Sequence, residues 1–325
     1  SSSVDLTLSA SDSGSGAAEM RFRDSGGSWG TWEPYGDSRT WTLSAGDGSK
    51  TVYVEYRDHV GRVSSTYSDS IILDTVAPTG SLLIDGGSAY ATTTSVNLTL
   101  AATDSTSGLD GMRFSDDGNT WTAWEPYDSS KAWTLPSGDG NKIVYVEFRD
   151  QAEHVSSPYS DSVILDTAAP VGTIVINSGD VYAPSTSVIL SLSASDAGSG
   201  VDDMRFSDDG TLWSGWEPYA SSKEWTLPTG DGSKAVYVEY RDHAGRVSES
   251  YADGIVLDTV APEGSLLVDA GAAYAISTLV SLSLSASDAG SGVTEMHFSD
   301  DGESWSAWEP YATNKAWTLP SGDGS

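Results

Sequence analysis

Residues 142–150 read KIVYVEFRD, and related stretches recur at a spacing of 92 residues, TVYVEYRD at 51–58 and VYVEYRDHAGRVS at 236–248. Each is rich in β-branched and aromatic residues, which favours a β-strand. The same spacing orders all twelve tryptophans into three columns: Trp29, Trp121, Trp213 and Trp305; Trp32, Trp124, Trp216 and Trp308; and Trp41, Trp133, Trp225 and Trp317. A fixed period without insertions predicts a tandem array of one domain.

The junction sequence LDTVAP, or LDTAAP in its second copy, sets the expected domain boundaries. Since 325 residues amount to three periods and a further 49 residues, we expect a window from a longer array. The expected domains are 1–76, a repeat that lacks its first strand; 77–168 and 169–260, two complete repeats; and 261–325, a repeat that stops before its last two strands.

Within 77–168 the pattern predicts about seven short strands and no helix. SVNLTLAA (95–102) alternates apolar and polar residues, the sign of a strand with one buried face. The other expected strands are TGSLLID (79–85), MRF (112–114), TWTAWEPY (120–127), KAWTL (131–135), KIVYVEFRD (142–150) and DSVILDT (161–167). This pattern predicts an all-β fold: tandem immunoglobulin-like β-sandwich domains of 92-residue period, arranged as a rod.

Composition and charge exclude several classes of function. The chain has 47 acidic and 16 basic residues, a net charge of −31, so it would repel the phosphates of nucleic acid. No apolar run approaches the roughly 18 residues of a membrane span. The histidines form no periodic set, and the HExxH, GxSxG and P-loop motifs do not occur. We therefore expect no nucleic-acid partner, no membrane span in this segment and no enzymatic activity.

The 33 aspartates, against 14 glutamates, concentrate in columns at predicted strand ends. In an immunoglobulin-like order, the loops after the second and sixth strands face the preceding domain. The junctions would then gather Asp74 with Asp104 and Asp150, Asp166 with Asp196 and Asp242, and Asp258 with Asp288. Because crowded carboxylates repel one another and all-oxygen ligand sets suit Ca²⁺, we hypothesise calcium at these joints. The alternative is that aspartates cap turns, which we favour for the SDDG and SGDG turns.

The tryptophans recur in the motif W-x-x-W-E-P-Y, and packing in the core and on strand faces is the favoured interpretation. In the alternative, an exposed aromatic shelf stacks sugars, and repetition makes the array multivalent. The shelf would consist of Trp124, Tyr127, Trp133, Trp216, Tyr219 and Trp225. Glu125 is expected to pair with Arg113 or Lys131.

The repeat resembles the immunoglobulin-like repeats of large bacterial or archaeal surface and secreted proteins. The resemblance is carried by LDTVAP, SASDAGSGV (193–201) and VYVEYRDHAGRVS (236–248). The last stretch is similar to D-x-A-G-N-x-S with Arg246 in place of Asn, and the second copy departs further, with Gln151-Ala-Glu-His154. Separately, SDDGNTW (115–121) resembles the Asp-box hairpin of sialidases, which is structural there. The resemblance implies an extracellular or cell-surface location, a spacer or shaft role, and calcium at some joints.

The near-identity of the copies favours a mechanical role. Residues 188–233 and 280–325 agree at 35 of 46 positions, a uniformity that suits a shaft better than a set of distinct binding sites. Proline in the junctions, as at Pro78, restricts the backbone around it. The sequence therefore predicts a structural segment of an extracellular fibre, adhesin stalk or surface appendage, with neighbouring repeats of the same chain as partners. The alternatives are a multivalent carbohydrate-binding array and chains that associate laterally into a filament.

Overall fold

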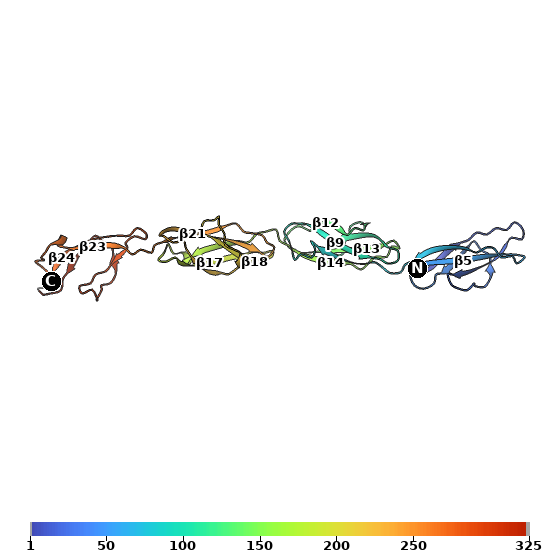
Figure 1. The fold of residues 1–325 in the computed structure, drawn as a ribbon, viewed down its shortest axis with the longest axis horizontal. Coiled ribbons are helices and arrows are strands. Elements are labelled where there is room, and N and C mark those ends of the chain that lie inside the picture. Colours follow the sequence, from blue (N-terminus) through green and yellow to red (C-terminus); the bar gives the residue numbers. More distant parts are fainter. Residues whose placement is uncertain (1, 323–325) are drawn as a thin grey trace. The chain divides into compact units, whose positions relative to one another are not determined.

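A computed structural model describes residues 2–322 of the protein. The chain forms two compact units, Ser1–Thr167 and Ala168–Ser325, and both consist of short β-strands joined by turns (Figure 1). Two 3₁₀ turns, η1 (Asn177–Gly179) and η2 (Asp269–Gly271), lie in the second unit. None of the helices in residues 2–322 has the length and apolar character that crossing a bilayer requires.

Residues 79–165 of the first unit form a β-sandwich. One sheet has the order β12-β9-β7, and the other has the order β11-β10-β13-β14-β8. All pairs are antiparallel except β14 and β8. This is the immunoglobulin-like arrangement that the sequence predicted. The strands are β7 (Thr79–Ile84), β8 (Tyr90–Ala91), β9 (Ser95–Thr103), β10 (Leu109–Ser115), β11 (Glu125–Pro126), β12 (Ser130–Thr134), β13 (Gly140–Asp150) and β14 (Tyr159–Leu165).

The core of this sandwich lies between the two sheets and follows from strand alternation. In β9 every second residue is buried, so Val96, Leu98 and Leu100 face the other sheet. From that sheet Phe114 and Phe148 meet them, and both rings are fully buried. The expected two-residue periodicity of SVNLTLAA is confirmed.

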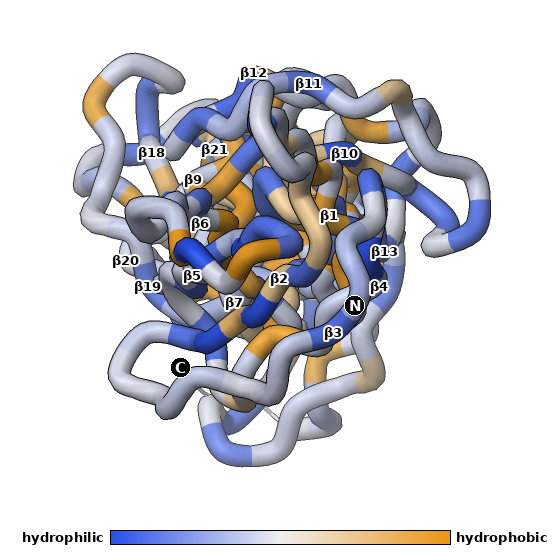
Figure 2. Tube along the Cα trace, turned by 90° about the vertical axis from the view of Figure 1, so that its right-hand side faces the viewer, coloured by the Kyte–Doolittle hydropathy of each residue, from blue (hydrophilic) through white to orange (hydrophobic). Residues whose placement is uncertain are grey.

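The residues before Leu73 form a similar but smaller arrangement in the same unit. Apolar and polar residues alternate along β2 and β5 (Figure 2), and Met20, Phe22 and Val54 belong to a separate hydrophobic core. Within residues 2–76 the structure contains no strand equivalent to β7. The strands are β1 (Ser3–Thr7) and β4 (Ser38–Thr42) in one sheet, and β2 (Ala17–Asp24), β3 (Glu33–Pro34), β5 (Gly48–Asp58) and β6 (Tyr67–Leu73) in the order β3-β2-β5-β6.

The second unit contains another complete sandwich and a shorter set of strands. The sandwich consists of β15 (Val171–Ile176), β16 (Tyr182–Ala183), β17 (Ser187–Ser195), β18 (Val201–Ser207), β19 (Glu217–Pro218), β20 (Ser222–Thr226), β21 (Gly232–Asp242) and β22 (Tyr251–Leu257). Its sheets have the orders β15-β17-β20 and β16-β22-β21-β18-β19. The remaining strands are β23 (Glu263–Val268), β24 (Leu279–Ser287), β25 (Glu295–Met296), β26 (Glu309–Pro310) and β27 (Asn314–Thr318), in sheets β23-β24-β27 and β25-β26. The division into four repeats stays a prediction, and each of the three hydrophobic cores falls within one predicted repeat.

One predicted strand is wrong in extent. Of TWTAWEPY (120–127), only Glu125–Pro126 is a strand, and the residues before it form turns and irregular backbone. The amide of Thr122 donates to the carbonyl of Phe114, so the segment folds back on β10 instead of extending as a full strand. The tryptophans of this segment pack against arginine side chains of β10 and β13, as described below, and that packing does not need a pleated strand.

Candidate functional site

The junction after β6 is organised by Asp74, whose side chain is buried. Its Oδ1 accepts a hydrogen bond from the amide of Val76 (3.1 Å), and its Oδ2 accepts one from the amide of Ser107 (3.0 Å). Hydrogen bonds from Ser107 hold the pKa of Asp74 below its ordinary value, with help from the Val76 amide, while burial acts in the opposite direction. Asp74 is therefore a charged group that ties β6 to the loop after β9.

The loop after β9 is built around Asp104. Its Oδ1 accepts hydrogen bonds from the amides of Thr106 (3.1 Å), Ser107 (2.9 Å) and Gly108 (2.8 Å). Gly108 has a φ of +83°, a conformation that glycine adopts without steric cost. The Ser107 amide is thus shared between Asp104 and Asp74. The aspartate at this position has a structural task, to cap its own loop, in addition to any role with a cation.

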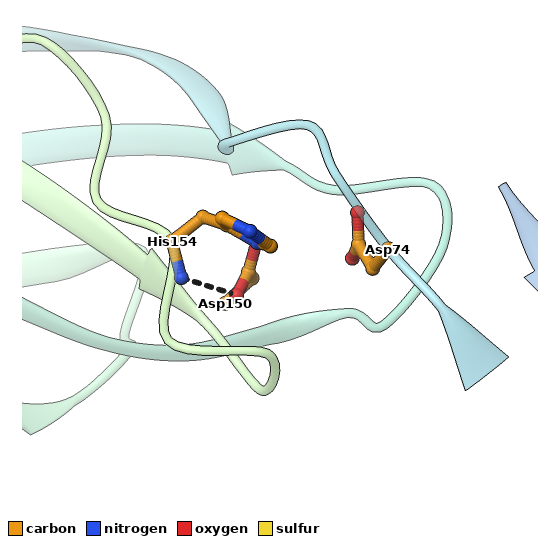
Figure 3. Close-up of side chains that lie close together, drawn as sticks. All are labelled: Asp74, Asp150 and His154. Atoms are coloured by element: carbon orange, nitrogen blue, oxygen red, sulfur yellow. Dashed lines mark hydrogen bonds and ion pairs between the residues drawn. The ribbon is translucent and has the colours of Figure 1, made fainter. Parts of the chain in front are cut away.

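Asp74 meets Asp150 and His154 at the same junction. Each of the three offers one potential ligand atom, and these atoms all lie within 4.8 Å of one another. Figure 3 shows the cluster, in which His154 Nδ1 lies 3.1 Å from Asp150 Oδ2. Asp150 is fully buried at the end of β13, and its Oδ1 accepts the amide of His154 (2.9 Å). The structure thus brings Asp74 and Asp150 together. Asp104 is linked to Asp74 through the Ser107 amide, which donates to both carboxylates.

Sequence reasoning did not include His154 in this site. The signal was present, because His154 stands in the same column as Arg62 and Arg246 at the spacing of 92 residues. That column carries a side chain that can be positively charged in all three copies. From the sequence alone, this column marks only a departure from the D-x-A-G-N-x-S loop pattern.

The second junction was predicted to involve Asp166, Asp196 and Asp242. Asp166 is buried directly after β14 in the first unit, where its amide donates to the carbonyl of Ala91. In the second unit Asp196 and Asp242 have potential ligand atoms within 4.8 Å of each other. Asp196 caps its loop as Asp104 does, through the amides of residues 198–200. Asp242 is buried and accepts the amide of Arg246.

At the third predicted junction, Asp258 lies beside Asp288. Asp258 Oδ2 accepts the amide of Ser291 (2.7 Å), and Asp288 accepts the amides of Gly290 and Gly292. Hydrogen bonding from Ser291 lowers the pKa of Asp258, and a side-chain hydrogen bond with Asp288 acts in the same direction. This pair of carboxylates has the same loop-capping geometry as the first junction.

These donor sets fit calcium in part. Calcium takes six to eight oxygen ligands, and the carboxylates of Asp74 and Asp150 at the first junction supply at most four. At the first junction the third group is an imidazole, a ligand that suits zinc, copper, iron or nickel better than calcium. Several of the carboxylate oxygens also already accept backbone hydrogen bonds. A bound calcium would therefore have to draw most of its ligands from backbone carbonyls and water.

The tryptophan columns form a ladder with arginines on the sheet that contains β10 and β13. The guanidinium of Arg113 lies 5.1 Å from the ring centroid of Trp121 and 4.7 Å from that of Trp124. Arg149 lies 4.7 Å from Trp124. Each arginine is held by a carboxylate, Arg113 by Glu147 (2.6 Å) and Arg149 by Asp110 (2.5 Å). We call these stacked side chains the tryptophan–arginine ladder.

The ladder recurs in the other repeats. Arg205 stacks on Trp213 and Trp216, and Arg241 stacks on Trp216 at 4.5 Å. In the first repeat Arg21 and Arg57 take the same places around Trp29 and Trp32. The last repeat has a histidine instead: the His297 ring stacks on Trp305 (4.3 Å) and on Trp308 (3.8 Å).

The predicted sugar-binding shelf is thus largely engaged within the protein. Trp133 is half-buried, packs on Phe114 at 5.3 Å and donates its indole N–H to Asp116 (3.0 Å). Tyr127 makes an edge contact with Phe148, and its hydroxyl accepts the amide of Ala102. The equivalent Trp225 and Tyr219 make the same contacts, and Trp124 and Trp216 belong to the ladder. These contacts match the favoured interpretation, packing on the core and strand faces.

The SDDG turns are capped by their second aspartate, as the sequence indicated. Asp117 Oδ1 accepts the amides of Asn119 (2.7 Å) and Thr120 (2.6 Å). These bonds, led by the one from Thr120, hold the pKa of Asp117 well below its ordinary value. Of the two partners predicted for Glu125, Lys131 is confirmed at 2.7 Å, since Arg113 pairs with Glu147.

Comparison with known proteins gives structural similarities. No protein-family model matches the chain, and no curated protein sequence matches it. Among solved structures, it is similar to the fibronectin(III)-like modules of Clostridium thermocellum CbhA, with 15% identity and a TM-score of 0.35 over 54% of this chain and 92% of that chain. It is also similar to a tetra-tandem repeat in the extending region of a large adhesion protein, with 18% identity and a TM-score of 0.29 over 98% of this chain and 86% of that chain.

A third similar structure is the D00-D0 domain of intimin, with 11% identity and a TM-score of 0.29 over 55% of this chain and 99% of that chain. At identities of 18% and below, this likeness concerns the fold.

Proposed function

We propose that the chain is a structural repeat segment of an extracellular surface protein, of the kind that forms an adhesin stalk or a fibre. The observation that carries the proposal is that the recurring tryptophans, arginines and loop-capping aspartates contact their own repeat, while Asp74 ties its junction to the loop of the next repeat. The recurring tryptophans stack on arginines or pack on the core, and the recurring aspartates cap loops. Selection for such contacts preserves a rigid unit and does not create a distinct binding surface in each copy.

A mechanical role is tested by stretching the whole chain with an atomic force microscope. Each complete 92-residue repeat should unfold as a separate event, and its release should lengthen the chain by roughly 300 Å at about 3.3–3.6 Å per extended residue. Two events of this size, of similar force, are expected from 77–168 and 169–260. Extension without resolved force peaks would contradict the proposal.

Calcium at the joints is a further part of the proposal. It is supported by the buried carboxylates of Asp74 and Asp150 at the first junction and by the pairing of Asp258 with Asp288 at the third. If calcium binds, the unfolding temperature should rise by several degrees on addition of calcium and return to its original value with EGTA. The Asp258→Asn variant should lose part of this increase, whereas Asp117→Asn, in a hairpin turn, should keep it. An unchanged unfolding temperature, together with no bound ion by mass spectrometry, would contradict calcium binding at the joints.

A multivalent carbohydrate-binding array is the alternative function. Its support lies in the last repeat, where Trp305 and Trp308 are both exposed. Glycan titration followed by tryptophan fluorescence distinguishes the two proposals, with Trp308→Ala as the variant and Trp133→Phe as the control. Saturable quenching that Trp308→Ala abolishes would favour carbohydrate binding over a purely structural role.

A further inference from the structure

The first junction brings two buried carboxylates close together. Asp74 is 5% exposed and Asp150 is 0% exposed, and one potential ligand atom of each lies within 4.8 Å of the other. Burying like charges at this separation is costly unless hydrogen bonds or a cation compensate them. The backbone amides of Val76, Ser107 and His154 supply part of that compensation. A cation held by both carboxylates would add to it.

The residue four positions after Asp150 distinguishes this junction from the others. The first and third repeats carry arginine at this position, Arg62 and Arg246, whereas the second repeat carries His154. An arginine stays protonated and has no lone pair for a metal, whereas a neutral imidazole is the commonest protein ligand of metals. Of the three copies of this position in the sequence, the second is therefore the one that can ligate a metal.

The spacing of the three side chains suits one small ion. His154 Nδ1 lies 3.1 Å from Asp150 Oδ2. Two ligands on zinc, with bonds of about 2.0–2.1 Å at the tetrahedral angle, lie about 3.3 Å apart. The ligand atom of Asp74 lies within 4.8 Å of the other two, so it needs to approach by at most about 1.5 Å. A small rotation of one side chain thus completes the set.

The existing hydrogen bonds leave room for an ion. Each carboxylate oxygen has two lone pairs, so one that accepts an amide can still bind a metal. The backbone amide of His154 donates to Asp150 Oδ1, and Oδ2 faces the imidazole. With the ring proton on Nε2, the lone pair of Nδ1 is available to the ion. The side chain of His154 is 34% exposed, so an ion and a water ligand can reach the site from solvent.

We propose that Asp74, Asp150 and His154 form a zinc site at the first junction, with water as the fourth ligand. Zinc suits a set that includes an imidazole better than calcium does. The ion would join the junction to the end of β13, beside the hydrogen bond that Asp74 accepts from the Ser107 amide. At this one junction zinc takes the place that the proposed function gives to calcium, and the other joints are unaffected.

Isothermal titration of the metal-free full chain with zinc, in an excess of calcium, tests the proposal. One zinc ion should bind per chain. His154→Arg installs the side chain that the first and third repeats carry, so the fold should persist while zinc binding weakens at least about tenfold. His243→Gln is the matched control, because it replaces an exposed imidazole by the residue that the second repeat has in that column, Gln151. No zinc binding, or equal binding by the two variants, would overturn the proposal.

The part played by the junction aspartate needs its own variant. Asp74→Asn keeps an oxygen that can accept the backbone amides but removes the charge, so it should also weaken zinc binding. Asp128→Asn, at an exposed loop position of the same repeat, should leave binding unchanged. The visible absorption of bound Co²⁺, used in place of zinc, should change in Asp74→Asn and stay the same in Asp128→Asn. Zinc binding and a cobalt spectrum that are indifferent to Asp74 would contradict the three-residue site.

The response of the unfolding temperature separates this site from the proposed calcium joints. His154→Arg should lose the increase that zinc causes and keep an increase that calcium causes, because the pair of Asp258 and Asp288 is unaltered. A chain that responds to calcium and not to zinc would overturn this inference and leave the proposed function intact. A chain that responds to zinc and not to calcium would support the zinc site and contradict the calcium joints.

Discussion

At the scale of single residues, the structure explains why tryptophan and arginine recur together. The Trp124 ring stacks with the guanidinium groups of Arg113 and Arg149, and a carboxylate holds each arginine. Cation–π contacts at exposed sites contribute about 0.5–1 kcal/mol each, and a partly exposed ion pair adds about 0–1 kcal/mol. The ladder therefore stiffens the outer face of a sheet whose other face is the core.

Replacement of Arg113 by alanine should lower the stability of the second repeat by about 1–2 kcal/mol, since two ring contacts and one ion pair are lost. Amide hydrogen exchange of β10 and β13 measures this repeat separately from the others. Protection there should fall by about a factor of ten, because 1.4 kcal/mol corresponds to a tenfold change. Lys142→Ala is the control, because its ammonium only reaches the carbonyl of Ser137 at 3.5 Å. Equal loss of protection in both variants would contradict the role of the ladder.

At the scale of elements, regular strands could be predicted from the sequence, and irregular segments could not. β9 and β13 carry alternating or β-rich patterns and lie where expected. β8 has only two residues, too few for any periodicity, and it exists because its partner β14 pairs with it. The aromatic residues of the segment before β11 favour a strand by composition, but in the structure its tryptophans stack in the tryptophan–arginine ladder.

The candidate site was predictable to a similar extent. The sandwich topology places the loop after β9 and the end of β13 beside Asp74, so the meeting of Asp74 with Asp150 followed from strand order. For His154 the sequence offers only its column with Arg62 and Arg246, because the contact of its imidazole with Asp150 depends on the conformation of one loop. The amide bonds to Asp104 were also beyond the sequence, although Gly108 is a sign of the tight turn that allows them.

The SDDG hairpins should make the stability of the protein depend on acidity. Amide hydrogen bonds lower the pKa of Asp117, Asp209 and Asp301 in the folded state. A carboxyl whose folded pKa is depressed stabilises the fold above its unfolded value of about 3.9, and that stabilisation is lost as the pH falls through the folded pKa.

We therefore expect the unfolding temperature to be constant near neutral pH and to fall below about pH 4. The triple variant Asp117→Asn, Asp209→Asn and Asp301→Asn should show a shallower fall than the unaltered chain. The variant with Asp37, Asp128 and Asp180 replaced by asparagine, of matched charge and outside the SDDG hairpins, should keep the original slope. Equal slopes for both variants, from calorimetry between pH 2 and 7, would show that the hairpins do not carry the effect.

At the scale of the whole molecule, a structural shaft requires repeats that fold separately and are joined by short junctions, and the predicted junctions contain proline. Three separate hydrophobic cores show that the sequence repeat is also a repeat of packing. The hydrogen bond from the Ser107 amide to Asp74 shows how one junction is tied to the loop that follows it. An array of such units transmits force along the chain if adjacent repeats keep a fixed direction.

Small-angle X-ray scattering of the full chain measures whether adjacent repeats keep a fixed direction. A strand of 11 residues such as β13 spans about 36 Å at about 3.3 Å per residue, so an extended array of three and a half repeats should be about 130 Å long. Its radius of gyration should then be about 35–40 Å and should change little between calcium and EGTA if the joints are stiff by themselves, or fall in EGTA if calcium stiffens them. A radius of gyration near 20 Å in both conditions, the value of a compact 325-residue globule, would contradict a structural shaft.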